Sequence, residues 1–187
     1  ANIKIAGLEL LSPNVSDKAV ASGSEMTYTW KVPDSAGPSR ADVSSVPYVY
    51  FSSVEPVSHV NAGLAGVIAV ASGGGLESHK NYPVDIPVVY PLLFNVFREN
   101  LSPLLEDSIK RYAEGDCSQQ DLDGLTEDEE WIESNAMHSI NGFLFCNNPT
   151  IESKVGVKVR FYIFGFGSEE SMHSPVFHNQ LVQSQVR

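Results

Sequence analysis

The sequence predicts an all-β protein, a sandwich of packed sheets with few short helices. Short apolar runs rich in β-branched and aromatic residues alternate with stretches of Gly, Pro and Ser along the whole chain. One run, residues 25–32 (EMTYTWKV), alternates strictly between apolar and polar positions, as a half-buried strand does. Asn141-Gly142 adds a turn signal between two apolar segments. Many short strands separated by turns favour a sandwich over a helical or α/β fold.

Four strands are expected before residue 73. They cover residues 3–11, 25–32, 46–51 and 66–71, with a loop rich in Pro, Gly and Ser over residues 33–44. In the second strand one face is expected to be buried, and it carries Met26, Tyr28, Trp30 and Val32. The fourth, GVIAVA, is apolar throughout and is expected to be buried.

Gly73-Gly74-Gly75 and the polar residues after it interrupt the pattern, so we expect a domain boundary there. The first unit is then residues 1–73, the linker residues 74–80, and the second unit residues 81–187. The second unit restarts with a strand over residues 84–99. Pro91 within that strand cannot donate a backbone hydrogen bond, which indicates an edge strand or a bulge.

The rest of the second unit is predicted to mix short helices and strands. Residues 104–113 read as a short helix capped by Ser102, residues 116–130 as an acidic loop, and residues 127–134 as another helical turn. Strands are expected again over residues 142–166 and 173–182.

Composition limits the function classes. The chain has 187 residues, 42% of them hydrophobic, a net charge of −11 and a pI near 4.7. An acidic surface cannot neutralise phosphates, so nucleic acid is not an expected partner. No apolar run approaches the ~20 residues that span a bilayer. We expect a secreted, extracellular protein whose numbering begins at a processed terminus, since its first residues do not resemble a signal peptide.

The two cysteines, Cys117 and Cys146, have two interpretations, a pair of free thiols or a disulfide. We favour the disulfide, because both flank residues 129–145 and other features indicate secretion. Closing this loop would stabilise the fold by about 3–4 kcal/mol in the chain-entropy model. Neither cysteine belongs to a motif with zinc-site spacing.

Two sequons mark Asn14 and Asn100 as candidate glycosylation sites. The acidic side chains of residues 121–133 are chemically suited to calcium. They lack EF-hand spacing, so a solvated acidic segment is the favoured interpretation.

Several motifs carry a resemblance to a known family. They are Glu133-Ser134-Asn135, Met137-His138, Ile140-Asn141-Gly142, Gly165-Phe166-Gly167, Tyr28-Thr29-Trp30, Gly37-Pro38 and Ala62-Gly63-Leu64-Ala65-Gly66. Together they resemble the ceruloplasmin, hephaestin and coagulation factor V/VIII family of tandem cupredoxin domains, the multicopper oxidase family. The resemblance implies cupredoxin-like Greek-key β-sandwiches, with the end of one domain followed by the start of the next.

The resemblance also implies where copper ligands would stand. Family members place imidazoles for a trinuclear copper cluster in an H-x-H-G stretch and a Y-H-S-H stretch. Here these align with residues 4–7 and 50–53, and the four histidine positions hold Lys4, Ala6, Phe51 and Ser53. A family disulfide between neighbouring strands aligns with Ser45 and Ala71, so it is lost at both ends.

One histidine in the second unit keeps its family place. His173 aligns with a ligand of a mononuclear copper site, whereas Val176 and Gln180 stand where a catalytic domain has histidines. A family calcium loop aligns with Asp17, but the neighbouring position is Lys18. Copper at His173 and calcium at Asp17 are therefore the two metal sites that the resemblance implies.

The resemblance begins inside one domain and stops inside the next. Half of a sandwich leaves open faces and edges. We expect another chain of the same precursor or family to supply the missing strands. The alternative is that the two halves fold on each other as a permuted sandwich.

Three functions are compatible with this sequence. The leading hypothesis is a secreted, non-catalytic portion of a ceruloplasmin-like protein that acts as a scaffold or binding subunit, as in the coagulation-factor branch. The second is a subunit of a copper ferroxidase whose catalytic histidines lie on other chains. The third is a carrier of a small apolar ligand or pigment, held by the aromatic runs 161–166 and 90–97, which otherwise read as core.

Overall fold

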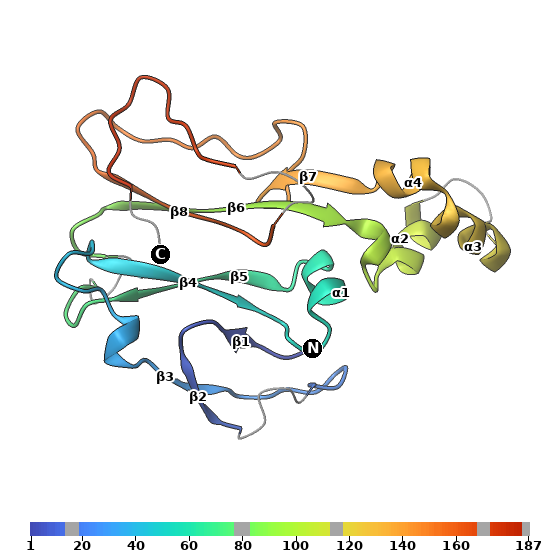
Figure 1. Ribbon diagram of the computed structural model, residues 1–187, viewed down its shortest axis with the longest axis horizontal. Coiled ribbons are helices and arrows are strands. Elements are labelled where there is room, and N and C mark those ends of the chain that lie inside the picture. The colour runs from blue at the N-terminus through green and yellow to red at the C-terminus, as the bar shows by residue number, and fades with distance from the viewer. Residues whose placement is uncertain (14–18, 77–82, 113–117, 168–172, 185–187) are drawn as a thin grey trace.

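The computed structural model describes residues 1–13, 19–76, 83–112, 118–167 and 173–184. The described residues form three small sheets, with strand orders β1-β4-β5, β2-β3 and β7-β6-β8 (Figure 1). All pairs are antiparallel except β6 with β8. The sheet β7-β6-β8 lies over the sheet that contains β4 and β5, and short helices gather at one end. The chain is thus an all-β sandwich, as predicted.

The centre of the first half is the antiparallel pair β4 (Ser45–Phe51) and β5 (Ala65–Ala71). Both strands match the prediction to within one residue. Ser45 lies directly opposite Ala71, the two positions that the resemblance assigns to a lost disulfide. β5 is half-buried rather than buried, because it lies at the edge of its sheet.

The single strand predicted over residues 3–11 is wrong. Two strands, β1 (Lys4–Ile5) and β2 (Glu9–Ser12), belong to different sheets. They are separated by Gly7, whose φ of 79° turns the chain. A Cβ at Gly7 would lie within 2.3 Å of the Tyr48 ring, so this close approach also requires glycine.

The alternating run 25–32 forms a strand only over β3 (Thr29–Lys31), paired with β2. Met26, Tyr28 and Trp30 are half-buried and the residues between them exposed, so the predicted alternation is present. Val32 is 52% exposed, against the prediction, because the strand ends before it. A 3-10 turn, η1 (Asp34–Ala36), starts the expected loop.

The second half is organised by β6 (Val88–Arg98), with β7 (Ala136–Ile140) on one side and β8 (Val159–Gly165) on the other. Pro91 lies in the part of β6 that pairs with β8 alone, so the predicted edge position is confirmed there, although β6 stands between β7 and β8 in the strand order. β7 ends opposite Phe94, so Pro91 lies beyond that pairing.

β6 tolerates this proline because β7 does not pair with it there, and Asn141 bonds the backbone at this place instead. Its side chain donates from Nδ2 to the Pro91 carbonyl (3.1 Å) and accepts from the Leu93 N–H (2.8 Å). Residues Asn141 and Gly142 both have positive φ, 54° and 79°, and join β7 to Phe143 through the predicted two-residue turn.

The helices are more numerous than predicted. α2 (Leu105–Tyr112) and α4 (Glu129–Ser134) were expected, and the Ser102 hydroxyl accepts from the Leu104 N–H at 3.2 Å ahead of α2. The acidic loop predicted over residues 116–130 is wrong, because the structure has α3 (Gln119–Glu127) there. Gln, Leu and Glu favour helix despite their polarity.

Two further elements had no prediction, α1 (Pro56–Asn61) and the 3-10 turn η2 (Glu99–Leu101). Pro56 stands at the first turn of α1, where its missing N–H costs nothing.

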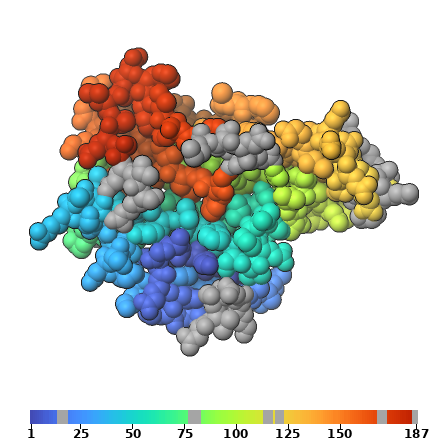
Figure 2. All heavy atoms as spheres, in the orientation of Figure 1, coloured from blue at the N-terminus to red at the C-terminus, as the bar shows by residue number. Residues whose placement is uncertain are grey.

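Two long stretches that were predicted as strands are irregular. Residues 142–166 form a strand only from Val159 onward, and described residues 173–182 form none. Figure 2 shows this C-terminal part as a lobe at one end of the molecule. Val155 is fully exposed there, and so is Leu181, so an apolar run did not suffice to form a strand without a partner.

Each sheet draws its strands from one side of residues 74–80. The two sides nevertheless contact each other, because Arg160 and Tyr162 of β8 reach Ser45 of β4. The division into units 1–73 and 81–187 stays a prediction.

Candidate functional site

The positions that the resemblance assigns to copper ligands lie together. Lys4 of β1 is the register partner of Phe51 of β4. Ser53 follows that strand, and its hydroxyl accepts from the Asn2 Nδ2 at 3.1 Å. Side chains of directly opposed residues on an antiparallel pair share a face. The backbone therefore brings together two of the positions that the resemblance assigns to copper ligands.

The residues themselves do not fit copper. A lysine ammonium has no lone pair to offer, and phenylalanine has no donor atom. Imidazole and thiolate are the usual ligands of copper sites in proteins. Positions 4 and 51 are thus brought together without a donor set.

A hydrogen-bonded triad lies next to these positions, and sequence reasoning missed it. The Ser52 hydroxyl contacts the His59 Nδ1 at 2.7 Å and accepts from the Asn2 N–H at 3.2 Å. A serine and a histidine at this distance resemble a nucleophile and its base. Ser52 has no exposed surface, however, and its hydroxyl bonds Asn2 as well as His59, so the contact fits a structural role.

The triad instead joins the N-terminal stretch to α1 and β4. Its members are distant in sequence, with 50 positions between Asn2 and Ser52. No motif connects these three residues, so no pattern in the sequence marked them.

His173 lies in the irregular segment 173–184 and is exposed. Val176 is also exposed, at 72%. Among the residues that the structure describes, no group of three His, Cys, Asp or Glu side chains comes close enough to hold a metal ion. Copper at His173 stays a prediction.

Several other predicted site residues lie outside the described residues. They are Asn14, Asp17 and Cys117. Asn100 is described and lies half-buried in η2, and its Oδ1 is buried without a hydrogen-bond partner. Glycosylation at both sequons and calcium at Asp17 stay predictions.

The disulfide also stays a prediction. Cys146 is exposed and has a φ of 64°. If it is bridged to Cys117, peptide mapping without reductant should recover one linked peptide pair. Reduction should then lower the free energy of unfolding by about 2–4 kcal/mol. Two thiols that alkylate in the native protein would contradict the bridge.

A buried polar network connects β4 to β8. The Arg160 side chain is 9% exposed, and its Nη1 donates to the hydroxyls of Ser44 (2.9 Å) and Ser45 (2.7 Å). Its Nη2 lies 3.2 Å from Oδ2 of Asp85. Ser45 also bonds the Tyr162 hydroxyl, and Ser44 donates to Asp85.

The carboxylate of Asp85 is charged in this network. Burial raises the pKa of Asp85, but hydrogen bonding from Ser44 and the positive charge of Arg160 together outweigh burial. The pKa therefore lies below its ordinary value of 3.8.

The aromatic runs considered for a pigment contact each other. Tyr90 of β6 stacks on Phe161 of β8 with ring centroids 5.8 Å apart, and Phe161 contacts Phe177 at 5.1 Å. These rings are therefore used in packing the second half.

In the described parts of the chain, no helix is long and apolar enough to span a bilayer.

No family model matches the sequence. Among curated proteins, human hephaestin is 33% identical over 169 residues, which is 90% of this chain and 14% of hephaestin. Human ceruloplasmin is 35% identical over 165 residues, 88% of this chain and 15% of ceruloplasmin. The human ferroxidase HEPHL1 is 32% identical over 163 residues, with coverages of 87% and 14%.

The chain thus spans about one seventh of the length of these relatives. The similarity extends over 87–90% of the chain. The chain belongs to the ceruloplasmin- and hephaestin-like multicopper oxidase family.

Proposed function

We propose that this chain is a secreted, non-catalytic segment of a ceruloplasmin-like protein and serves as a scaffold or binding surface. The observation that carries the proposal is the pairing of Lys4 with Phe51. The backbone brings these two positions together, and neither side chain can bind copper. A protein that has this backbone arrangement but lacks the copper-binding side chains is expected to act through its surface.

Copper content tests this proposal. After incubation with excess copper and desalting, the chain should retain less than one equivalent of copper and should not oxidise ferrous iron, because Lys4, Ala6, Phe51 and Ser53 supply no imidazole. One bound copper with a strong visible band would instead favour a mononuclear site at His173. Elemental analysis and an iron-oxidation assay measure both. A trinuclear set of copper ions in the isolated chain would overturn the proposal. Activity that arises only on adding another chain would favour the ferroxidase-subunit hypothesis.

A designed histidine pair provides the positive control. The variant Lys4→His/Phe51→His places two imidazoles directly opposite each other and should gain binding of Cu(II). The matched control Lys31→His/Lys158→His adds the same two imidazoles at exposed positions on separate elements. Equal affinities in the two variants would mean that positions 4 and 51 do not form a site.

A further inference from the structure

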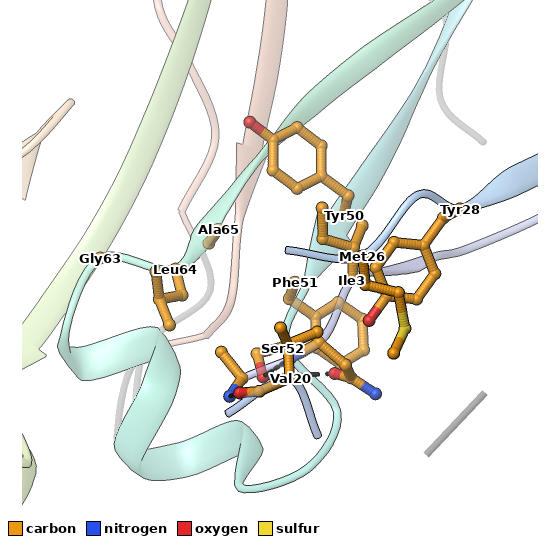
Figure 3. A pocket seen from close by; sticks show the side chains of 12 residues that line it. Ile3, Val20, Met26, Tyr28, Tyr50, Phe51, Ser52, Gly63, Leu64 and Ala65 are labelled. Carbon is orange, nitrogen blue, oxygen red and sulfur yellow. Dashed lines mark hydrogen bonds between the residues drawn. The ribbon is translucent and has the colours of Figure 1, made fainter. Parts of the chain in front are cut away.

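A pocket of about 410 Å³ opens beside the end of β4 (Figure 3). Four separate segments build it: the N-terminal stretch, the residues before β3, β4 itself and the turn after α1. Its apolar walls include Ile3, Val20, Met26, Phe51 and Leu64. Phe51 stands where the family motif has a histidine, and its ring makes this part of the pocket wall apolar.

The size of the pocket indicates a small molecule. A cavity of about 150 Å³ holds one benzene ring, so a space of about 410 Å³ has room for two or three fused or linked rings. Small-molecule sites typically have about 300–1,000 Å³ and mostly apolar walls. At the mouth, Ile3 and Leu64 are 43% and 44% exposed, so apolar area there is uncovered.

One polar group in the pocket wall has no partner. The Tyr28 hydroxyl is buried and makes no hydrogen bond within the described residues. Figure 3 shows this hydroxyl directed toward Phe51, among the pocket residues. A buried, unpaired hydroxyl costs about 1–3 kcal/mol, and a ligand atom that accepts its proton would remove that cost.

The other polar residues in the wall already have partners. Asn2 and Ser52 bond each other, with the Ser52 hydroxyl 3.3 Å from the Asn2 Oδ1. Among the described residues no Asp, Glu, Lys, Arg or His side chain lines the pocket, and the amino group of Ala1 there donates to the Val20 carbonyl at 3.4 Å. The ligand is therefore expected to be uncharged.

We propose that this pocket binds a neutral, apolar molecule of two or three rings with one hydrogen-bond acceptor, held by the Tyr28 hydroxyl. The inference does not rest on the proposed scaffold function, because a carrier or a scaffold could equally hold such a ligand. It differs from the pigment site considered from the sequence, which used the aromatic runs of β6 and β8.

A pair of matched probes tests the proposal on the full chain. 2-Acetylnaphthalene carries a carbonyl acceptor, and 2-ethylnaphthalene has nearly the same shape without one. Titration calorimetry should show one saturable site for both and about three- to tenfold tighter binding of the ketone, the contribution of one neutral hydrogen bond. In Tyr28→Phe this preference should disappear while the hydrocarbon binds as before.

Charge placed at the mouth should abolish binding. Leu64→Lys should weaken both probes by at least about tenfold, since an ammonium cannot be buried against an apolar ligand. Leu104→Lys, the same substitution at a position that is 52% exposed and does not line the pocket, is the matched control and should change neither affinity. Circular dichroism checks folding, and Met26→Lys replaces Leu64→Lys if the latter does not fold.

Three results would overturn the site. They are the absence of saturable binding, an equal loss in Leu64→Lys and Leu104→Lys, and a ketone preference that persists in Tyr28→Phe. A ketone preference that persists in Tyr28→Phe would show that the carbonyl oxygen of the probe contacts another group. The assignment of the Tyr28 hydroxyl as the hydrogen-bond donor would then be wrong.

Discussion

Replacing Arg160 with methionine should lower the free energy of unfolding by about 2–3 kcal/mol. Methionine keeps much of the buried volume but makes none of the three contacts of the guanidinium with Ser44, Ser45 and Asp85. Ser45 is 1% exposed, so water does not replace the lost donor. Because these contacts connect β4 to β8, the loss also weakens the packing of one half on the other. Urea denaturation measures the change.

The chain offers a matched control for this variant. Lys31 and Glu9 form an ion pair with the same N–O distance as Arg160 and Asp85, 3.2 Å, but both partners are 57% exposed. Exposed pairs contribute at most about 1 kcal/mol, so Lys31→Met should cost far less. If both variants lose the same stability, burial of the Arg160 network contributes nothing and the interpretation is wrong.

The stabilisation that the pairing of Asp85 with Arg160 gives to the fold depends on pH in a defined direction. The pKa of Asp85 is lower in the folded protein than its ordinary value of 3.8, so its pairing stabilises the fold above that pH. The stabilisation is lost as the pH falls through the lower, folded pKa. The difference between wild type and Arg160→Met should therefore shrink in strong acid.

The predictable parts of the fold were those with local signals. The Asn141-Gly142 turn was recognised because two positive φ values favour this dipeptide. The strands β4 and β5 were recognised by their β-branched and aromatic content. The cap at Ser102 was found from its place before a proline and a helical run.

The parts that could not be predicted depend on distant contacts. β6 pairs with β7 only from Phe94 onward, and the Asn141 side chain bonds Pro91 and Leu93 just beyond that pairing. The strand expected over residues 3–11 is broken at Gly7 by its packing against Tyr48, more than forty positions away in the sequence. Residues 155–158 are apolar enough for a strand, but no neighbouring strand pairs with them.

The residues of the candidate site fall into the same two groups, those that the sequence could indicate and those that only the folded structure shows. The positions that the resemblance aligns with family copper ligands, Lys4 and Phe51, are register partners, and so are those aligned with a family disulfide, Ser45 and Ala71. The Ser52–His59 contact and the unpaired Tyr28 hydroxyl required the folded structure, because no motif connects them.

The largest expected effect concerns assembly, which we propose on the basis of exposed area. The chain exposes 13568 Å², whereas a compact monomer of 20.4 kDa exposes about 8,800 Å² by the scaling of surface with mass. The excess is roughly 4,700 Å² on this one chain, whereas a stable obligate interface buries about 1,000–2,500 Å² on each partner, half of a total of about 2,000–5,000 Å². Apolar side chains contribute to it, with Val155 at 107%, Leu181 at 105% and Phe145 at 90% exposure.

We therefore expect the native protein to be a stable complex in which a strand-rich segment of the same family covers the C-terminal lobe of Figure 2. Native mass spectrometry and size exclusion should find this chain with a second polypeptide or in a larger covalent assembly of such domains. Val155→Glu/Leu181→Glu should weaken the complex, because carboxylates at an apolar contact lose water without gaining a partner. Val57→Glu, on α1 and 63% exposed, is the control and should leave it intact. A well-folded monomer of 20.4 kDa would refute the assembly and show that the contacts of Arg160 and Tyr162 with β4 suffice to hold the two halves as one permuted sandwich.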